Sequence, residues 1–186
     1  MKAGILLFAL LFICFSGNAA PMDDEKDVRD LPTRERIFIG GYLGLQIGTI
    51  TSINISPTIG YLITNQLSAG VGGTYQYYRN RGWLLINNIS YSAHIYGGSV
   101  FARYRITRNI FAHVELEALN LDSRIGFDVQ REESRFWERN YFVGGGYRQE
   151  LGPRTFLNVM LLYNFNSNSV IYHQNPIFRF GIDVSI

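Results

Sequence analysis

Two pairs of charged residues stand close together near the middle of the chain. Arg103 and Arg105 are separated by one residue, and Glu115 and Glu117 have the same spacing. Paired carboxylates are residues that general acid–base catalysis uses. Arginines beside them, however, would hold both carboxylates ionised. We therefore interpret the four residues as a charge network rather than as a catalytic pair.

The remaining residues with reactive side chains are scattered. The histidines, His94, His113 and His173, lack the spacing of a metal site. No histidine, serine and acid fall together on one face of an expected element. The only cysteine is Cys14, which lies in an apolar N-terminal run. The sequence therefore predicts no enzyme, no metal site and no cofactor.

The charged pairs belong to segments in which apolar and polar residues alternate, the pattern of strands with one apolar face. Eight such segments follow residue 36. We expect strands at about 36–48, 52–63, 66–78, 92–106, 110–121, 140–151, 155–166 and 177–186. Their lengths exceed those usual in soluble sheets and suit tilted strands that cross a bilayer.

The connections between these strands alternate in length. Tight turns are expected at Asn65, at 107–109 and at 152–154, and long loops at 79–91, 122–139 and 167–176. Short turns at one rim and long loops at the other are typical of outer-membrane barrels. The expected fold is all-β: an eight-stranded antiparallel up-and-down transmembrane β-barrel.

The charges indicate which face of the strands points inward. After residue 36 the chain has twelve basic and nine acidic residues, and eight of these lie on the expected strands. All eight fall on the polar face: Arg103, Arg105, Glu115, Glu117, Arg148, Glu150, Arg179 and Asp183. An arginine facing lipid near the bilayer midplane costs about 2–4 kcal/mol, so a lipid-facing surface is kept free of charge. We therefore expect the apolar face to contact lipid.

The N-terminus has the order of a secretory signal peptide. Lys2 precedes an unbroken apolar run at 5–15, and the small residues Gly17 and Ala19 follow. We expect residues 1–19 to be cleaved. Lipid attachment at the cysteine is the alternative, but a bulky isoleucine stands before it instead of a small residue.

Residues 20–35 form a charged N-terminal extension, and ten of the fifteen residues from 22 to 36 are charged. A solvated lead-in to the first strand is the simpler interpretation, and a docking segment is the alternative. Residues 36–186 then make up the barrel domain. The formal net charge of +2 argues against nucleic acid as a partner.

The last expected strand carries a further pattern: Arg179 and Gly181, followed by the apolar residues Val184 and Ile186. In this the chain resembles the small eight-stranded outer-membrane barrels, such as the OmpA transmembrane domain and OmpX, over about residues 36–186. The four residues occupy the places of the family's C-terminal assembly signal, although an aromatic residue is usual where Ile186 stands. The resemblance implies insertion by the outer-membrane assembly machinery, contact with outer-membrane lipid, and no single function.

The eight charged residues of the polar face allow two interpretations. One is a plug of paired charges that fills the lumen, and the other is a narrow pore in which the pairs exchange partners. The expected pairs are Arg103 and Arg105 with Glu115 and Glu117, Arg148 with Glu150, and Arg179 with Asp183. An eight-stranded barrel is just wide enough for side chains to fill it, which favours the plug.

The loop at 122–139 is the expected recognition surface, because aromatic and arginine residues are enriched in binding sites. Those residues are Phe127, Arg131, Arg135, Phe136 and Trp137. A solvated loop whose aromatic residues fold back over the barrel mouth is the rival interpretation.

We expect a monomer in the cell outer membrane with a structural or surface-interaction role, whose partner is a surface ligand or protein. The alternatives are a narrow pore for small solutes and a soluble periplasmic lipocalin-like carrier.

Overall fold

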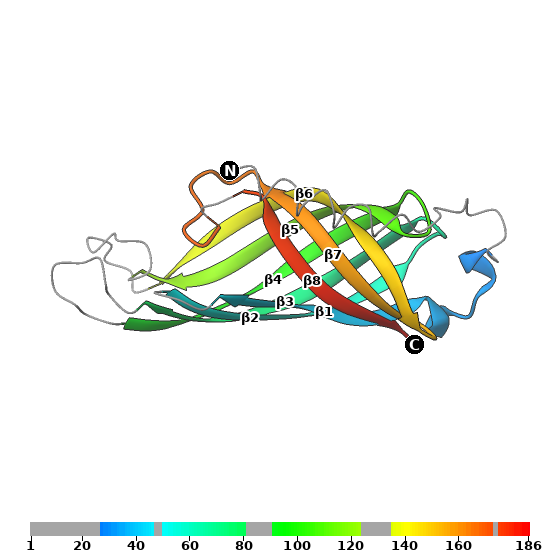
Figure 1. The fold of residues 1–186 in the computed structure, drawn as a ribbon, viewed down its shortest axis with the longest axis horizontal. Helices are drawn as coiled ribbons and strands as arrows, with labels where there is room; N and C mark the ends of the chain where they lie inside the picture. The colour runs from blue at the N-terminus through cyan, green and yellow to red at the C-terminus, as the bar shows by residue number, and fades with distance from the viewer. Residues whose placement is uncertain (1–26, 47–49, 81–90, 124–134, 173–174) are drawn as a thin grey trace, which may run out of the picture.

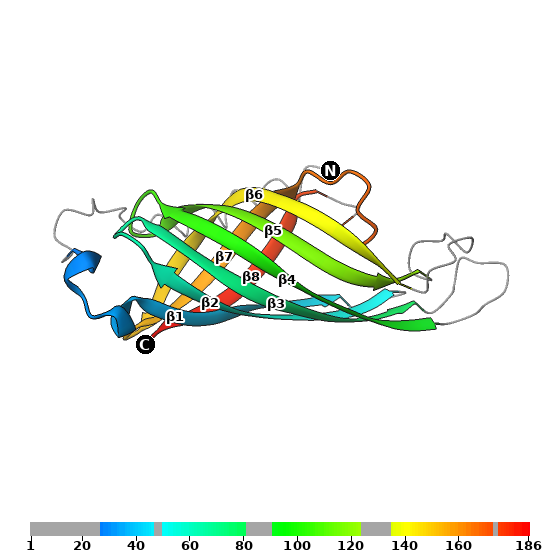
Figure 2. The ribbon, with the colours of Figure 1, turned by 180° about the vertical axis from the view of Figure 1, so that it is seen from behind.

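The strands of this chain close into a single barrel (Figures 1 and 2). The computed structural model describes residues 27–46, 50–80, 91–123, 135–172 and 175–186. The eight strands are β1 Ile37–Gln46, β2 Ile50–Leu62, β3 Leu67–Asn80, β4 Tyr91–Arg105, β5 Ile110–Asp122, β6 Arg135–Gly152, β7 Thr155–Asn164 and β8 Ile177–Ser185. Each strand pairs antiparallel with the next, so the expected eight-stranded up-and-down architecture is confirmed.

The first and last strands complete the ring. β1 pairs antiparallel with β8, from Phe38 opposite Ser185 to Leu43 opposite Phe180. Closure gives each strand two neighbours and leaves no sheet edge with unpaired backbone groups. It also places every second residue of each strand in the interior, so the two alternating sets of residues in the sequence face the inside and the outside of the barrel.

Strand β6 begins five residues earlier than the sequence predicted. Residues 135–139 were expected in a loop, but they extend the ladder with β5, where Asp122 lies opposite Arg135. The alternation continues through this stretch: Glu138 is buried, whereas Trp137 and Arg139 are exposed. Its charges concealed the strand, because Arg135, Glu138 and Arg139 interrupt the apolar alternation that marks the other strands.

Two short 3-10 helices, η1 Val28–Asp30 and η2 Thr33–Arg36, precede β1 at the turn end of the barrel (Figure 1). The Val28 side chain is buried, and its backbone N–H donates to Asn65 Oδ1 at 2.5 Å. Val28 therefore anchors this segment to the barrel, while most of the other residues of 27–36 are exposed. The expected signal peptide at 1–19 and the start of the extension at 20–26 lie outside the described residues.

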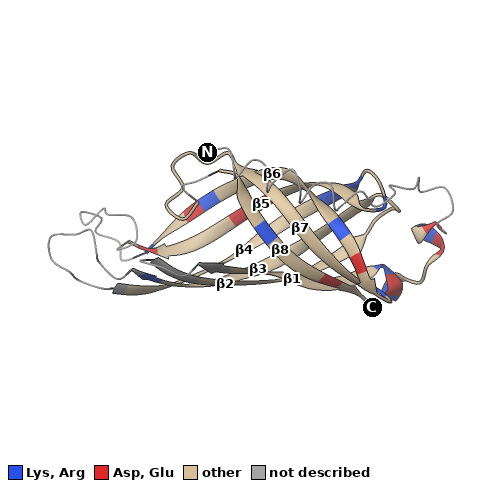
Figure 3. Ribbon diagram, in the orientation of Figure 1, with Lys and Arg blue, Asp and Glu red and all other residues tan. Residues whose placement is uncertain are grey.

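Charged residues lie along the central parts of several strands (Figure 3), and Arg103, Glu115 and Asp183 among them are buried, whereas many large apolar side chains are exposed on the outer face. Outward-facing Val100, Leu116 and Ile182 each keep about half of their surface exposed, at 51%, 54% and 50%. No helix within the described ranges is long and apolar enough to cross a membrane.

Inward glycines make room for the large interior side chains. Phe38 on β1 lies opposite Gly60 on β2, and a Cβ atom at Gly60 would overlap the Phe38 ring. Tyr42 lies over Gly181 of β8 in the same way. These glycines are needed for the close approach of a ring to the barrel wall.

We predict that Gly60→Val destabilises the barrel, because the added methyl groups displace the buried Phe38 ring. Overpacking of this kind costs about 1–3 kcal/mol of unfolding free energy. The matched control is Gly73→Val on β3, where an added Cβ meets no atom within 4 Å. Denaturant unfolding of the purified protein measures both variants. Equal losses at the two positions would contradict the packing argument.

Candidate functional site

Two ion pairs join non-neighbouring strands through the interior of the barrel. Arg103 Nη1 on β4 lies 2.6 Å from Asp183 Oδ2 on β8, and Arg179 Nη1 on β8 lies 2.6 Å from Glu115 Oε2 on β5. The most exposed of these four side chains keeps only 13% of its surface accessible. The lumen is therefore crossed by paired charges that are shielded from solvent.

These pairings correct the partners expected from the sequence. Arg179 was expected to pair with Asp183, and Arg103 with an acid of the adjacent strand. Residues four apart on one strand are separated by about 13 Å, so Arg179 and Asp183 are too far apart for a direct contact. Inward side chains instead reach across the lumen, and the two arginines take the carboxylates of distant strands.

Arg103 lies at the centre of an aromatic enclosure. Its guanidinium group donates to the Tyr42 hydroxyl as well as to Asp183. Its Cζ atom lies 4.7 to 5.7 Å from the ring centroids of Phe38, Tyr42, Phe101 and Phe111. Cation–π contacts gain strength where water is excluded, so the rings add to the stabilisation of this buried cation by its ion pair.

The second cluster surrounds the two glutamates of β5. Glu115 also interacts with His113, whose Nε2 lies 3.1 Å from Glu115 Oε2, and it accepts a hydrogen bond from Ser99. Glu117 accepts hydrogen bonds from Thr74 Oγ1, at 3.1 Å, and from Tyr172. Both glutamates are therefore buried with several donors around them, an arrangement that fixes side chains in place.

The other residues of the expected network lie nearer the turn end. Arg105 Nε donates to the Asn65 backbone carbonyl at 3.0 Å, and the Arg148 guanidinium lies 3.5 Å from the Phe156 ring centroid. Glu150 is exposed. The eight expected residues are thus divided between a buried central cluster and the turn-end mouth.

At the loop end, the segment after β7 folds back over the barrel mouth (Figure 1). Glu138 of β6 holds it: the carboxylate accepts from Ser169 Oγ at 2.6 Å and from the Val170 N–H at 2.7 Å. Apolar side chains beneath include buried Ile95, Leu119 and Leu121, and Val170 and Tyr172 pack against them. This apolar layer caps the charged interior.

The expected recognition residues are placed differently from the prediction. Phe127 and Arg131 lie outside the described residues, and Arg135, Phe136 and Trp137 belong to β6 rather than to a loop. Phe136 packs against the interior apolar layer, whereas Trp137 faces outward with 63% of its surface exposed. Arg135 stacks over the Tyr96 ring at 4.5 Å.

The closing-strand pattern maps onto the two faces of β8. Gly181 is buried and Arg179 mostly buried, so both face the interior, while Val184 and Ile186 are exposed on the outside. The sequence did not single out Tyr42, Phe101 or Phe111 as partners of the charges. The alternation could have identified them, because these rings occupy the same inward-facing alternate positions of their strands as the charged residues do.

The described residues contain no group of three or more histidine, cysteine, aspartate or glutamate side chains that could hold a metal ion. The interior carboxylates accept hydrogen bonds from fixed donors of the barrel wall or of the segment after β7. Chemically, the arrangement neutralises buried charge and fills the lumen.

The geometry defines a closed antiparallel barrel with a charge-paired interior. No protein-family model and no curated protein matches the chain. Among solved structures, the chain is similar to the Yersinia pestis outer membrane protein Ail in a phospholipid bilayer nanodisc, at 14% identity and a TM-score of 0.47, covering 80% of this chain and 97% of that one. It is also similar to the N-terminal β-barrel domain of Pseudomonas aeruginosa OprF, at 11% identity and a TM-score of 0.39, covering 80% and 93%.

We predict strong coupling between Arg103 and Asp183. Arg103→Met should lower the free energy of unfolding by about 3–5 kcal/mol, because it leaves a buried carboxylate unpaired. Arg103→Met combined with Asp183→Leu should lose less than the sum of the single variants. These variants form a double-mutant cycle. A matched control cycle combines substitutions of Arg179 and Asp183, and the losses of unfolding free energy in that cycle should add within about 0.5 kcal/mol. Equal coupling in both cycles would show that the cross-lumen pairing is wrong.

Proposed function

We propose that this chain is an integral outer-membrane protein with a closed interior and a structural or surface-interaction role. The observation that carries the proposal is the outer face of the barrel. Large apolar side chains stand exposed around it on every strand, among them Ile39, Ile59, Val71, Val100, Val114, Val143, Leu161 and Phe180. Soluble monomers rarely expose contiguous apolar patches above a few hundred Å². Lipid is the solvent that suits such a surface.

The distribution of outward-facing charges and rings supports a membrane placement. Exposed Arg79 and Arg139 lie near the loop-side ends of their strands. Outward aromatic rings form two groups, with Tyr75, Tyr141 and Tyr163 toward the loop end and Tyr104 toward the turn end. Amphipathic rings favour the two membrane–water interfaces. A lipocalin-like carrier would instead need an apolar interior, whereas here the interior contains ion pairs.

The interior favours a closed barrel over a pore for small solutes. The central ion pairs, with the aromatic rings around Arg103, and the apolar layer at the loop end occupy two levels of the lumen. A conducting path would require both to move. The closed interior leaves the surfaces at the two ends as the places where partners bind.

Export and assembly belong to the same proposal. Residues 1–19 act as the cleaved signal peptide, and the closing-strand residues Arg179, Gly181, Val184 and Ile186 serve as the signal for the outer-membrane assembly machinery. The sequence segment between β5 and β6, with Phe127 and Arg131, contacts a surface ligand or protein. The support for this last role is the composition of the segment and its position between β5 and β6.

We predict that the purified protein in detergent shows heat-modifiable migration on a denaturing gel, because a closed barrel resists the detergent until it is boiled. Planar bilayers containing the protein should show no stable conductance steps. Unchanged migration together with a β-rich circular dichroism spectrum in plain buffer would indicate a soluble carrier. Stable conductance steps would indicate a pore.

We predict that residues 124–134 are dispensable for folding. Asp122 and Arg135 lie opposite each other, so a short glycine–asparagine turn can join β5 to β6. The replacement should leave the unfolding midpoint unchanged. Phe136→Ala should lower it, with a loss of about 1–3 kcal/mol for a partly buried ring, and Trp137→Ala on the outer face is the matched control. A loss on loop replacement as large as that of Phe136→Ala would assign the segment a structural role.

A further inference from the structure

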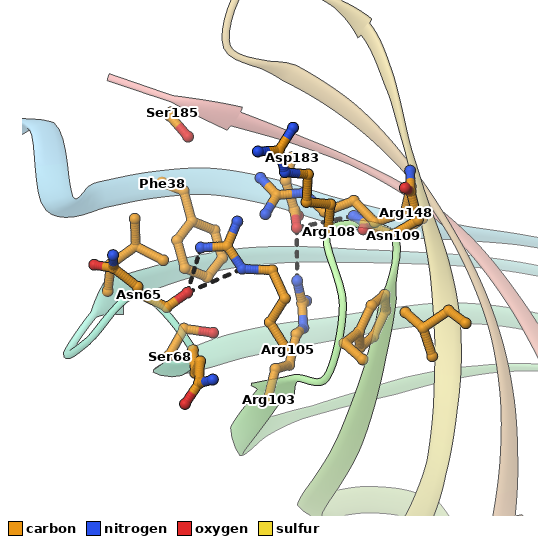
Figure 4. A pocket seen from close by; sticks show the side chains of 15 residues that line it. Phe38, Asn65, Ser68, Arg103, Arg105, Arg108, Asn109, Arg148, Asp183 and Ser185 are labelled. Atoms are coloured by element: carbon orange, nitrogen blue, oxygen red, sulfur yellow. Dashed lines mark hydrogen bonds and ion pairs between the residues drawn. The ribbon is translucent and has the colours of Figure 1, made fainter. Parts of the chain in front are cut away.

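The turn end of the barrel contains a pocket that the proposed role does not use. Its walls come from the turns and strand ends at that end of the barrel (Figure 4). The ion pair between Arg103 and Asp183 lies on its inner side, together with Phe38 and Phe111. Arg108, on the turn between β4 and β5, is exposed. The pocket is therefore a recess that opens toward solvent at the turn end and closes at the central ion pair.

Positive charge dominates the described lining of this pocket. It contains the four arginines Arg103, Arg105, Arg108 and Arg148 and one acid, Asp183, which gives a net charge of +3. Guanidinium groups gathered between low-dielectric walls repel one another and raise the local concentration of anions. The pocket is thus electrostatically suited to an anion.

Three buried polar atoms at the inner wall add a second, independent indication. Arg103 keeps 7% of its surface exposed, and its Nε–H has no hydrogen-bond partner among the described residues. Asn158 Oδ1 is likewise buried without a described partner, while its Nδ2 group donates to Asp183 Oδ2, and Asp183 Oδ1 has no described partner either. The inner wall therefore offers one unfilled donor and two unfilled acceptors next to the arginines.

We propose that this pocket binds a phosphate group, whether of free phosphate, of a monoester or of a phospholipid headgroup. A phosphate dianion presents several acceptor oxygens to guanidinium groups, and bidentate pairing favours arginine as its ligand. In its protonated form, phosphate also has an O–H that can donate to an acceptor such as Asn158 Oδ1. Arg108 recruits the anion at the opening, and Arg105 and Arg148 flank it from β4 and β6.

Isothermal titration of the full chain in a phosphate-free detergent tests the proposal. Sodium phosphate should give saturable binding that sodium chloride at equal ionic strength does not. Arg108→Gln should weaken the binding about tenfold, because one charge-assisted contact is lost. The matched control Arg139→Gln removes an exposed arginine at the loop end and should leave binding unchanged. Absence of phosphate binding above the chloride level overturns the proposal, as does equal weakening by both variants.

A second arm identifies the source of the phosphate group. Glycerol 3-phosphate is titrated into the protein in nanodiscs of phosphatidylglycerol and of phosphatidylcholine. Binding that is equal in the two bilayers supports a free phosphate or monoester as the ligand. Binding lost only in phosphatidylglycerol supports the pocket as a site for the anionic lipid headgroup, because the headgroup then competes. Loss in both bilayers overturns the proposal.

Discussion

The ion pair between Arg103 and Asp183 is the interaction on which the interior depends. It links β4 to β8 across the lumen, and β8 is also the strand that closes the ring against β1. Bringing two charges out of water is costly unless their remaining hydrogen-bonding groups find partners. Tyr42 accepts a further hydrogen bond from the arginine, and Asn158 donates one to the aspartate, so the demand is met only in part: Arg103 Nε and Asp183 Oδ1 have no partner among the described residues. The glycines beside Phe38 and Tyr42 then follow, because rings of this size fit beside a guanidinium only where the paired residue of the neighbouring strand lacks a Cβ.

The arrangement inverts the usual relation between core and surface. In a water-soluble protein the hydrophobic effect gathers apolar side chains inside, whereas here the largest exposed class is aliphatic and the buried set includes arginine, glutamate, histidine and asparagine. In the proposed membrane setting, lipid removes the penalty for an apolar exterior, so the interior can be polar as long as its groups are paired. The assumption that lipid surrounds the barrel thus accounts for both faces of each strand. In water, the same barrel would expose apolar side chains unfavourably and would also bear the desolvation cost of its buried charges.

The fold followed from the sequence because its signal is local. Alternation assigns each residue to a face, and a charge census over those faces identifies the inside without any knowledge of contacts. The partners of the charges did not follow, because they are set by distance across the lumen rather than by adjacency along or between strands. Arg179 takes Glu115 rather than Asp183 for this reason. The early start of β6 was hidden by Arg135, Glu138 and Arg139, because charges on both faces of this stretch break the apolar alternation from which the strands were predicted.

The lumen is built in layers with different chemistry, and the layers separate the two ends of the molecule. The loop end is sealed by an apolar layer that Glu138 fastens to the segment after β7. The middle holds the ion pairs, and the turn end opens into an arginine-lined recess. A ligand in that recess meets the central ion pair before it reaches any residue of the loop end. Side chains packed at the density of a core move little individually. The loops and the recess are therefore two independent surfaces on opposite sides of one plug, and a change at one should leave binding at the other unaffected.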